Sequence, residues 1–124
     1  MTEDQLRVRK ALDLYIKFWS AWVAFRQEPV GKTQIQLKER YDAFKPFNPE
    51  SGVAAELSAV MRFLGYGRWS GSEFERYVSR GSGAFDQLHG AMTTQISKYP
   101  NDAREVISQS RYTGPPFDLP PGNR

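Results

Sequence analysis

Apolar side chains recur at steps of three and four residues along most of this 124-residue chain, with polar side chains between them. That spacing gathers apolar positions on one face of an α-helix, whereas the alternation that marks β-strands is almost absent. The pattern therefore predicts an all-α protein. The predicted helices cover residues 3–27, 33–44, 49–64, 71–80 and 85–99, and a sixth helix follows Pro100.

Residues with special backbone preferences mark the ends of the first three helices. Thr2 is a favourable N-cap residue, and Pro29 followed by Gly31 ends the first helix. Thr33 begins a capping box and is predicted to open the second helix. Asn48 is predicted to cap the third helix, with a proline at its first position.

The later helix ends are predicted from serine, glycine and aspartate. Two overlapping capping boxes begin at Ser70 and Ser72, so the fourth helix starts there in one of two registers. Gly81 and Gly83 are predicted to break it, because glycine is a poor helix former. Asp102 is predicted to cap the sixth helix.

The middle of the first helix is apolar around most of its circumference. Ten of the twelve residues from Leu14 to Phe25 are apolar or aromatic, whereas a peripheral helix carries a single apolar stripe. The run is shorter than the roughly 18 residues of a membrane span, and Lys17 interrupts it. Two interpretations follow: the helix is the buried centre of a bundle, or Trp19, Trp22 and Phe25 form an interface with a partner or a second copy.

The composition changes at Thr113. The prolines and glycines of residues 113–124 exclude a helix and predict an extended, proline-rich tail. We therefore expect a helical domain over residues 1–112, built as a compact bundle of five or six helices around the long N-terminal helix. Phe117 and Leu119 point to the same side of an extended chain. Such a tail docks on its own domain, docks on a neighbour or stays disordered.

Composition and charge narrow the chemistry. The chain contains no cysteine, which excludes disulfides, thiolate metal sites and cysteine nucleophiles. Because the composition fits a reducing compartment and no signal peptide is visible, we expect a cytoplasmic protein. We expect no cofactor and no metal. The net charge of +3 is mild, and basic and acidic residues are mixed along most of the chain, as on an ordinary solvated surface.

A glycine-rich turn between residues 65 and 72 is one candidate site. It leads into a helix N-terminus, which attracts anions, and its rings and arginines are interleaved as on surfaces that bind phosphate or single-stranded nucleic acid. It lacks the strand and the Lys-Ser/Thr ending of a P-loop, and an ordinary turn between two helices explains the same glycines. The candidate contacts are Arg62, Tyr66, Arg68, Trp69, Arg76 and Arg80.

The single histidine, His89, lies three residues after Asp86, so the two share a helix face, as a general acid–base pair requires. No nucleophile motif accompanies them. The first functional hypothesis is therefore a non-enzymatic protein-interaction module (an adaptor, inhibitor or regulatory subunit) that binds a protein partner or forms a homodimer through its first helix and its tail. Binding of nucleic acid or phosphate is the second hypothesis, and catalysis through His89 is the third.

Overall fold

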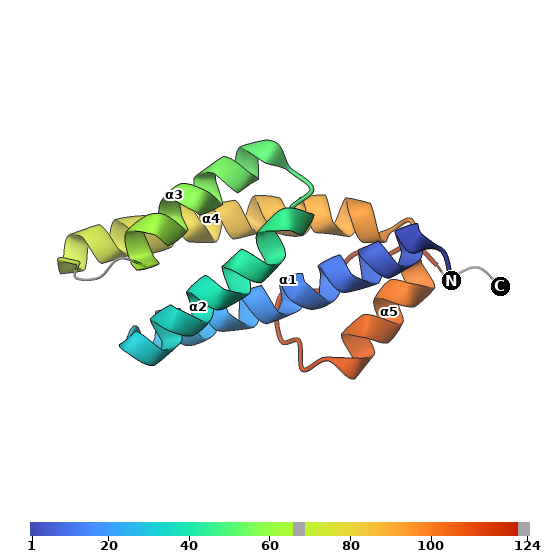
Figure 1. Ribbon diagram of the computed structural model, residues 1–124, viewed down its shortest axis with the longest axis horizontal. Helices are drawn as coiled ribbons and strands as arrows, with labels where there is room; N and C mark the ends of the chain where they lie inside the picture. The colour runs from blue at the N-terminus through green and yellow to red at the C-terminus, as the bar shows by residue number, and fades with distance from the viewer. Residues whose placement is uncertain (66–68, 122–124) are drawn as a thin grey trace.

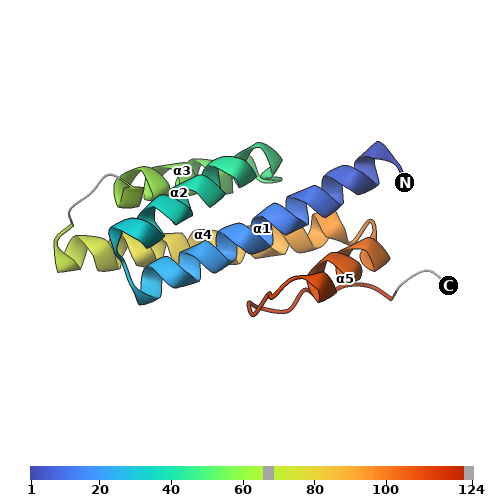
Figure 2. The ribbon, with the colours of Figure 1, turned by 60° about the horizontal axis from the view of Figure 1, so that its bottom comes forward.

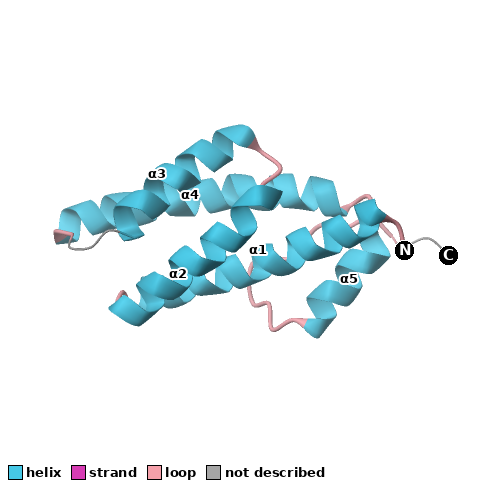
Figure 3. Ribbon diagram, viewed as in Figure 1, coloured by secondary structure: helices cyan, strands magenta, loops and turns pink. Residues whose placement is uncertain are grey.

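The computed structural model describes residues 1–65 and 69–121, and every regular element within them is helical (Figure 3). The all-α prediction is therefore confirmed. None of the described helices has the length and apolar character that a membrane span requires. The elements are α1 (Glu3–Gln27), α2 (Gly31–Phe44), the short 3-10 helix η1 (Lys45–Phe47), α3 (Ser51–Gly65), α4 (Gly71–Ile96) and α5 (Pro100–Gln109).

Three helices, α2, α4 and α5, pack against α1 (Figures 1 and 2). The helix α3 packs mainly on α4 and α2, so it joins these two helices instead of lying along α1. Aromatic rings from three helices meet in the core between them. The ring of Phe18 in α1 lies 4.7 Å from that of Phe85 in α4 and 5.7 Å from that of Phe44 in α2, measured between centroids.

The helix α1 begins and ends where the sequence predicts. The hydroxyl oxygen of Thr2 accepts a hydrogen bond from the Gln5 backbone N–H at 3.1 Å, and the Gln5 side chain accepts one from the Thr2 backbone N–H at 2.9 Å. This reciprocal pair is a complete capping box. At the other end, the backbone leaves the helical conformation at Glu28, directly before Pro29.

The chain's own helices cover the apolar middle of α1. Trp22 is 1% exposed and Phe25 is 0% exposed. The indole of Trp22 stacks on the ring of Phe85 in α4, with centroids 5.2 Å apart. Of the two interpretations of the first helix, burial within its own domain therefore describes these side chains, and no partner is needed to remove them from water.

The helix α4 is continuous, so the predicted break at Gly81 and Gly83 is wrong. Gly81 is explained by packing, because a Cβ atom added there would lie only 2.5 Å from Cη2 of Trp22. Glycine costs a helix about 1 kcal/mol relative to alanine, and here its missing side chain lets the indole approach the α4 backbone. The predicted fourth and fifth helices are therefore one helix, and the described residues contain five α-helices.

Two predicted caps lie away from their expected positions. The helix α2 begins before Thr33, whose hydroxyl oxygen accepts a hydrogen bond from the Val30 backbone N–H at 3.1 Å inside the first turn. The helix α3 begins after Asn48, whose side-chain oxygen accepts one from the Glu50 backbone N–H at 3.0 Å. Both side chains thus satisfy a nearby backbone donor, as short polar side chains do in turns, without standing at the N-cap.

At the start of α4, the structure selects one of the two predicted registers. Ser70 is the N-cap residue, and its hydroxyl oxygen accepts a hydrogen bond from the Glu73 backbone N–H at 3.3 Å. Asp102 does not cap α5, because the N-cap residue there is Tyr99. The carboxylate of Asp102 instead accepts a hydrogen bond from the guanidinium of Arg9 at 2.8 Å, and this ion pair joins α5 to α1.

Candidate functional site

The chain after Arg111 lies against the helical domain, and we call residues 112–121 the C-terminal segment. Figure 1 shows it turning after α5 and running back toward the end of the molecule that holds the N-terminus. Phe117 and Leu119 are half-buried and pack against the core. The sequence left three outcomes open for the tail: docking on its own domain, docking on a neighbour, or disorder. In this structure, residues 112–121 dock on the chain's own helices. Residues 122–124 lie outside the described part of the chain.

The ring of Phe117 anchors the C-terminal segment. It stacks on the imidazole of His89 in α4, with centroids 4.5 Å apart and an angle of 23° between the planes. Tyr15 of α1 meets the same ring edge-on at 5.9 Å, and Tyr112 stacks on it at 5.3 Å. Each aromatic pair stabilises the fold by about 0.5–1.5 kcal/mol beyond the contribution of the area that it buries. This cluster therefore holds Phe117 in one position.

His89 holds the main chain of the C-terminal segment as well. Its Nε2 lies 3.1 Å from the carbonyl oxygen of Pro116, and its Nδ1 lies 3.2 Å from the hydroxyl oxygen of Tyr15. A carbonyl oxygen only accepts, so Nε2–H is the donor to Pro116, and in the neutral ring Nδ1 accepts the hydrogen bond from Tyr15. Burial raises the pKa of Tyr15, which keeps its hydroxyl a donor. No hydrogen bond joins His89 to Asp86 among the described residues, so the expected pair is not formed.

Tyr112 and Arg104 hold the two ends of the segment. The ring of Tyr112 meets Trp19 of α1 edge-on at 5.5 Å, and its hydroxyl donates a hydrogen bond to the carbonyl oxygen of Pro115 at 2.6 Å. Burial raises the pKa of Tyr112 to about 12, so the docked state favours its neutral phenol. The guanidinium of Arg104 in α5 donates to the carbonyl oxygen of Leu119 at 3.5 Å.

Of the aromatic residues predicted to form an interface on the first helix, Trp19 alone is only half-buried. Trp22 and Phe25 instead lie in the core, because packing within one chain already covers them. In this structure, packing within the chain accounts for the burial of these two side chains. Trp19 adjoins the segment that carries Phe117 and Leu119, and we call the surface formed by Tyr15, Trp19 and His89 the docking surface.

The structure brings two of the predicted arginines together. The guanidinium carbons of Arg76 and Arg80 in α4 lie 5.3 and 4.9 Å from the ring centroid of Tyr77. Arg80 also forms an ion pair with Glu56 of α3, in which Nε lies 3.0 Å from Oε1. The charge of Arg80 is therefore already balanced, and the ring of Tyr77 contacts both arginines and stacks on Phe63.

The other members of the predicted anion site do not extend this pair into one surface. The ring of Trp69 packs on core aromatic rings, and its Nε1–H donates to the carbonyl oxygen of Phe63 at 3.2 Å, so it is not presented for stacking with a base. Arg62 lines a separate hollow between α2 and α3. Tyr66 and Arg68 lie outside the described residues.

The sequence did not point to Tyr15 or Tyr112 as part of the site. In the linear pattern, Tyr15 belongs to the apolar run of the first helix, and nothing distinguishes it from a core residue. His89 was a candidate for acid–base chemistry, but its partners come from positions 15 and 116, far from it in the sequence. The aromatic residue in the tail was the one local signal for this site.

Comparisons with protein-family models, with curated proteins and with solved structures find no match for this chain. Within the described residues, no group of three or more His, Cys, Asp or Glu side chains is placed to hold a metal ion.

Proposed function

We propose that this chain is a non-enzymatic protein-interaction module that binds an extended protein segment on the docking surface. The observation that carries the proposal is how the C-terminal segment is held. His89 stacks on the ring of Phe117 and donates a hydrogen bond to the carbonyl oxygen of the preceding Pro116. One imidazole thus contacts the side chain and the main chain of the same short stretch, which is the combination that peptide-binding surfaces use for specificity and affinity.

The C-terminal segment also suggests the chemistry of the partner. It has the order Pro-Pro-Phe-Asp-Leu over residues 115–119, and its prolines reduce the conformational entropy that is lost on docking. A partner of the same kind presents an aromatic residue directly after proline, in a stretch without regular secondary structure. A second copy of this chain is one source of such a stretch, because exchange of identical segments is a low-cost route to a dimer.

In this proposal, the chain's own segment competes with the partner. The effective concentration of a tethered segment is of the order of millimolar, so the docking surface is occupied until a better ligand or a high concentration of ligand displaces it. Such competition suits an adaptor or a regulatory subunit. We further propose a cytoplasmic location, which the cysteine-free composition supports.

Binding of a labelled peptide with the sequence of residues 112–121 tests the proposal. We expect the full-length Phe117→Ala variant to bind this peptide at least about tenfold more tightly than the wild type, because its own segment has lost the anchoring ring; tenfold corresponds to about 1.4 kcal/mol. Fluorescence anisotropy measures the affinity. Adding His89→Ala to that variant should abolish the gain.

Ile35→Ala is the matched control, since Ile35 is 62% exposed on α2 and makes no contact with the C-terminal segment among the contacts described. This variant should bind as the wild type does. If correctly folded Phe117→Ala protein binds no peptide, or binds a peptide that lacks the phenylalanine equally well, the proposal is wrong.

A nucleic-acid or phosphate function at Arg76 and Arg80 has less support. Glu56 balances the charge of Arg80, and the ring of Trp69 is engaged in packing. Sequence-independent binding to single strands depends on free cations and free ring faces, so we retain protein binding as the proposed function.

A further inference from the structure

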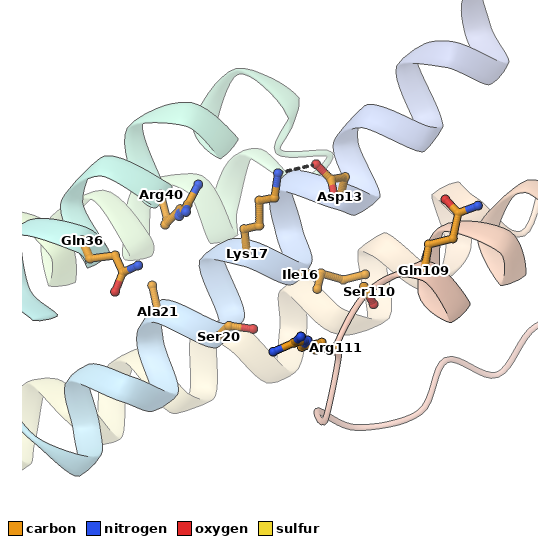
Figure 4. Close-up of a pocket in the computed structure, with 10 residues that line it drawn as sticks. All are labelled: Asp13, Ile16, Lys17, Ser20, Ala21, Gln36, Arg40, Gln109, Ser110 and Arg111. Carbon is orange, nitrogen blue, oxygen red and sulfur yellow. Dashed lines mark ion pairs between the residues drawn. The ribbon is translucent and has the colours of Figure 1, made fainter.

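A groove with a volume of about 430 Å³ lies where α1, α2 and the end of α5 meet (Figure 4). Its floor includes Ile16 and Ala21 of α1, which are 4% and 5% exposed. Figure 4 shows Arg40 on the α2 side of α1 and Arg111 on the α5 side. The volume falls within the range of roughly 300–1,000 Å³ that is typical of small-molecule sites, which combine apolar walls with a few polar groups.

The lining of the groove has an excess of positive charge. It contains three cationic side chains and one carboxylate. Lys17 forms an ion pair with that carboxylate, on Asp13, at 3.0 Å. Arg40 and Arg111 have no ion-pair or hydrogen-bond partner in the described part of the chain. Within the described residues, these two guanidinium groups therefore line the groove without a counter-charge.

Arg40 lies within a helix, and Arg111 is an exposed residue shortly after the end of α5. Arg40 is half-buried near the middle of the last two turns of α2. The backbone beside Arg111 is held by Ser110, whose hydroxyl donates to the carbonyl oxygen of Ile107 at 2.7 Å and accepts from the Tyr112 backbone N–H at 3.3 Å. Backbone that hydrogen bonds already hold in place loses less conformational entropy when a ligand binds.

We infer that this groove binds a small polyvalent oxyanion, with carboxylate or phosphate oxygens, between Arg40 and Arg111. The planar guanidinium group matches either kind of oxygen pair with two parallel hydrogen bonds. Ser20 and Gln36 line the same groove and offer neutral donors to the remaining oxygens. A monovalent anion leaves one guanidinium unmatched, so the arrangement selects for ligands with two or more negative charges.

The test is an NMR titration of the full chain with pyrophosphate, citrate and acetate at constant ionic strength. We expect saturable shifts of the Arg40 and Arg111 side-chain signals with pyrophosphate, citrate or both, and none with acetate at the same concentration. Arg40→Gln combined with Arg111→Gln should weaken binding at least about tenfold. Arg76→Gln, which removes one positive charge on α4 outside the groove, should leave binding unchanged.

Each outcome has a defined meaning. Saturable binding of pyrophosphate alone assigns a phosphate ligand, and binding of citrate alone assigns a carboxylate ligand. No saturable shift with either, equal binding of acetate, or an equal loss in the Arg76→Gln variant overturns the inference. Peptide binding at the docking surface is measured on different residues, so the two proposals fail independently.

Discussion

Gly81 lies in the middle of α4, where the indole of Trp22 rests against the helix backbone. In an isolated helix this glycine is unfavourable, because it has more conformational entropy to lose than alanine. Within the folded chain, the missing Cβ makes room for one of the largest buried side chains. A residue that weakens its own helix thus strengthens the packing between two helices.

Replacing Gly81 by alanine should lower the free energy of unfolding by about 1–3 kcal/mol, the usual cost of overpacking a core. Gly83→Ala is the matched control, since a Cβ added there meets no atom within 4 Å. Its better helix propensity should raise the free energy of unfolding by roughly 0.5–1 kcal/mol. Urea unfolding followed by circular dichroism measures both, and equal stabilities would show that Trp22 does not restrict position 81.

Among the elements, the C-terminal segment differs from the helices in what holds it. A helix satisfies most of its backbone hydrogen bonds internally, whereas this segment relies on side chains of other elements, including His89 and Arg104. Elements held by few contacts are released at a smaller free-energy cost than the global unfolding of the domain. The half-buried phenol of Tyr112 provides one way to release it.

We expect alkaline pH to release the C-terminal segment. The pKa of Tyr112 is raised from its ordinary value of 10.0 to about 12 by burial, so docking favours the neutral phenol. Its contribution to stability is complete below about pH 10 and is lost as the pH rises toward 12. Tyrosinate absorbance and the NMR signals of the Phe117 ring follow the change.

Tyr112→Phe supplies the control for this titration, because phenylalanine cannot ionise. In this variant, the Phe117 signals should keep their docked positions to higher pH than in the wild type. Release at the same pH in both proteins would assign the effect to another group and contradict the role of Tyr112.

At the scale of the whole molecule, the apolar middle of α1, which suggested a partner in the sequence, is largely covered by other parts of the same chain. Trp22 and Phe25 are enclosed by the helices around them, so self-association through these residues would require the core to open. Large apolar side chains that do remain exposed in the described residues include Leu6 and Ile35. We propose exchange of C-terminal segments as a form of self-association that leaves every helix folded.

Light scattering over a range of concentrations tests this view of assembly. We expect a monomer at tens of micromolar, because the tethered segment has an effective concentration of the order of millimolar. Dimers should form only near that concentration, and Phe117→Ala should weaken them. A dimer that is stable at micromolar concentration and insensitive to Phe117→Ala would identify a different interface.

Much of the fold could be predicted from the sequence, because helix formation depends on residues close together in the chain. The bounds of α1 follow from Thr2 and Pro29, and the start of α4 follows from the capping box at Ser70. The prediction failed at Gly81, where helix propensity opposes the helix and a contact with a distant residue outweighs it. The candidate site was harder to predict, since His89 contacts positions 15, 116 and 117.

The sequence by itself determined the all-α class, the apolar character of the first helix and the non-helical nature of the proline-rich tail. These properties follow from side-chain periodicity and from the backbone geometry of single residues. Only the tertiary structure decided that Trp22 is covered by α4, that Phe117 lies on His89, and that Arg40 faces the same groove as Arg111. Each of these arrangements brings together residues that are far apart in the chain, and it depends on how helix surfaces fit together, which no local pattern records.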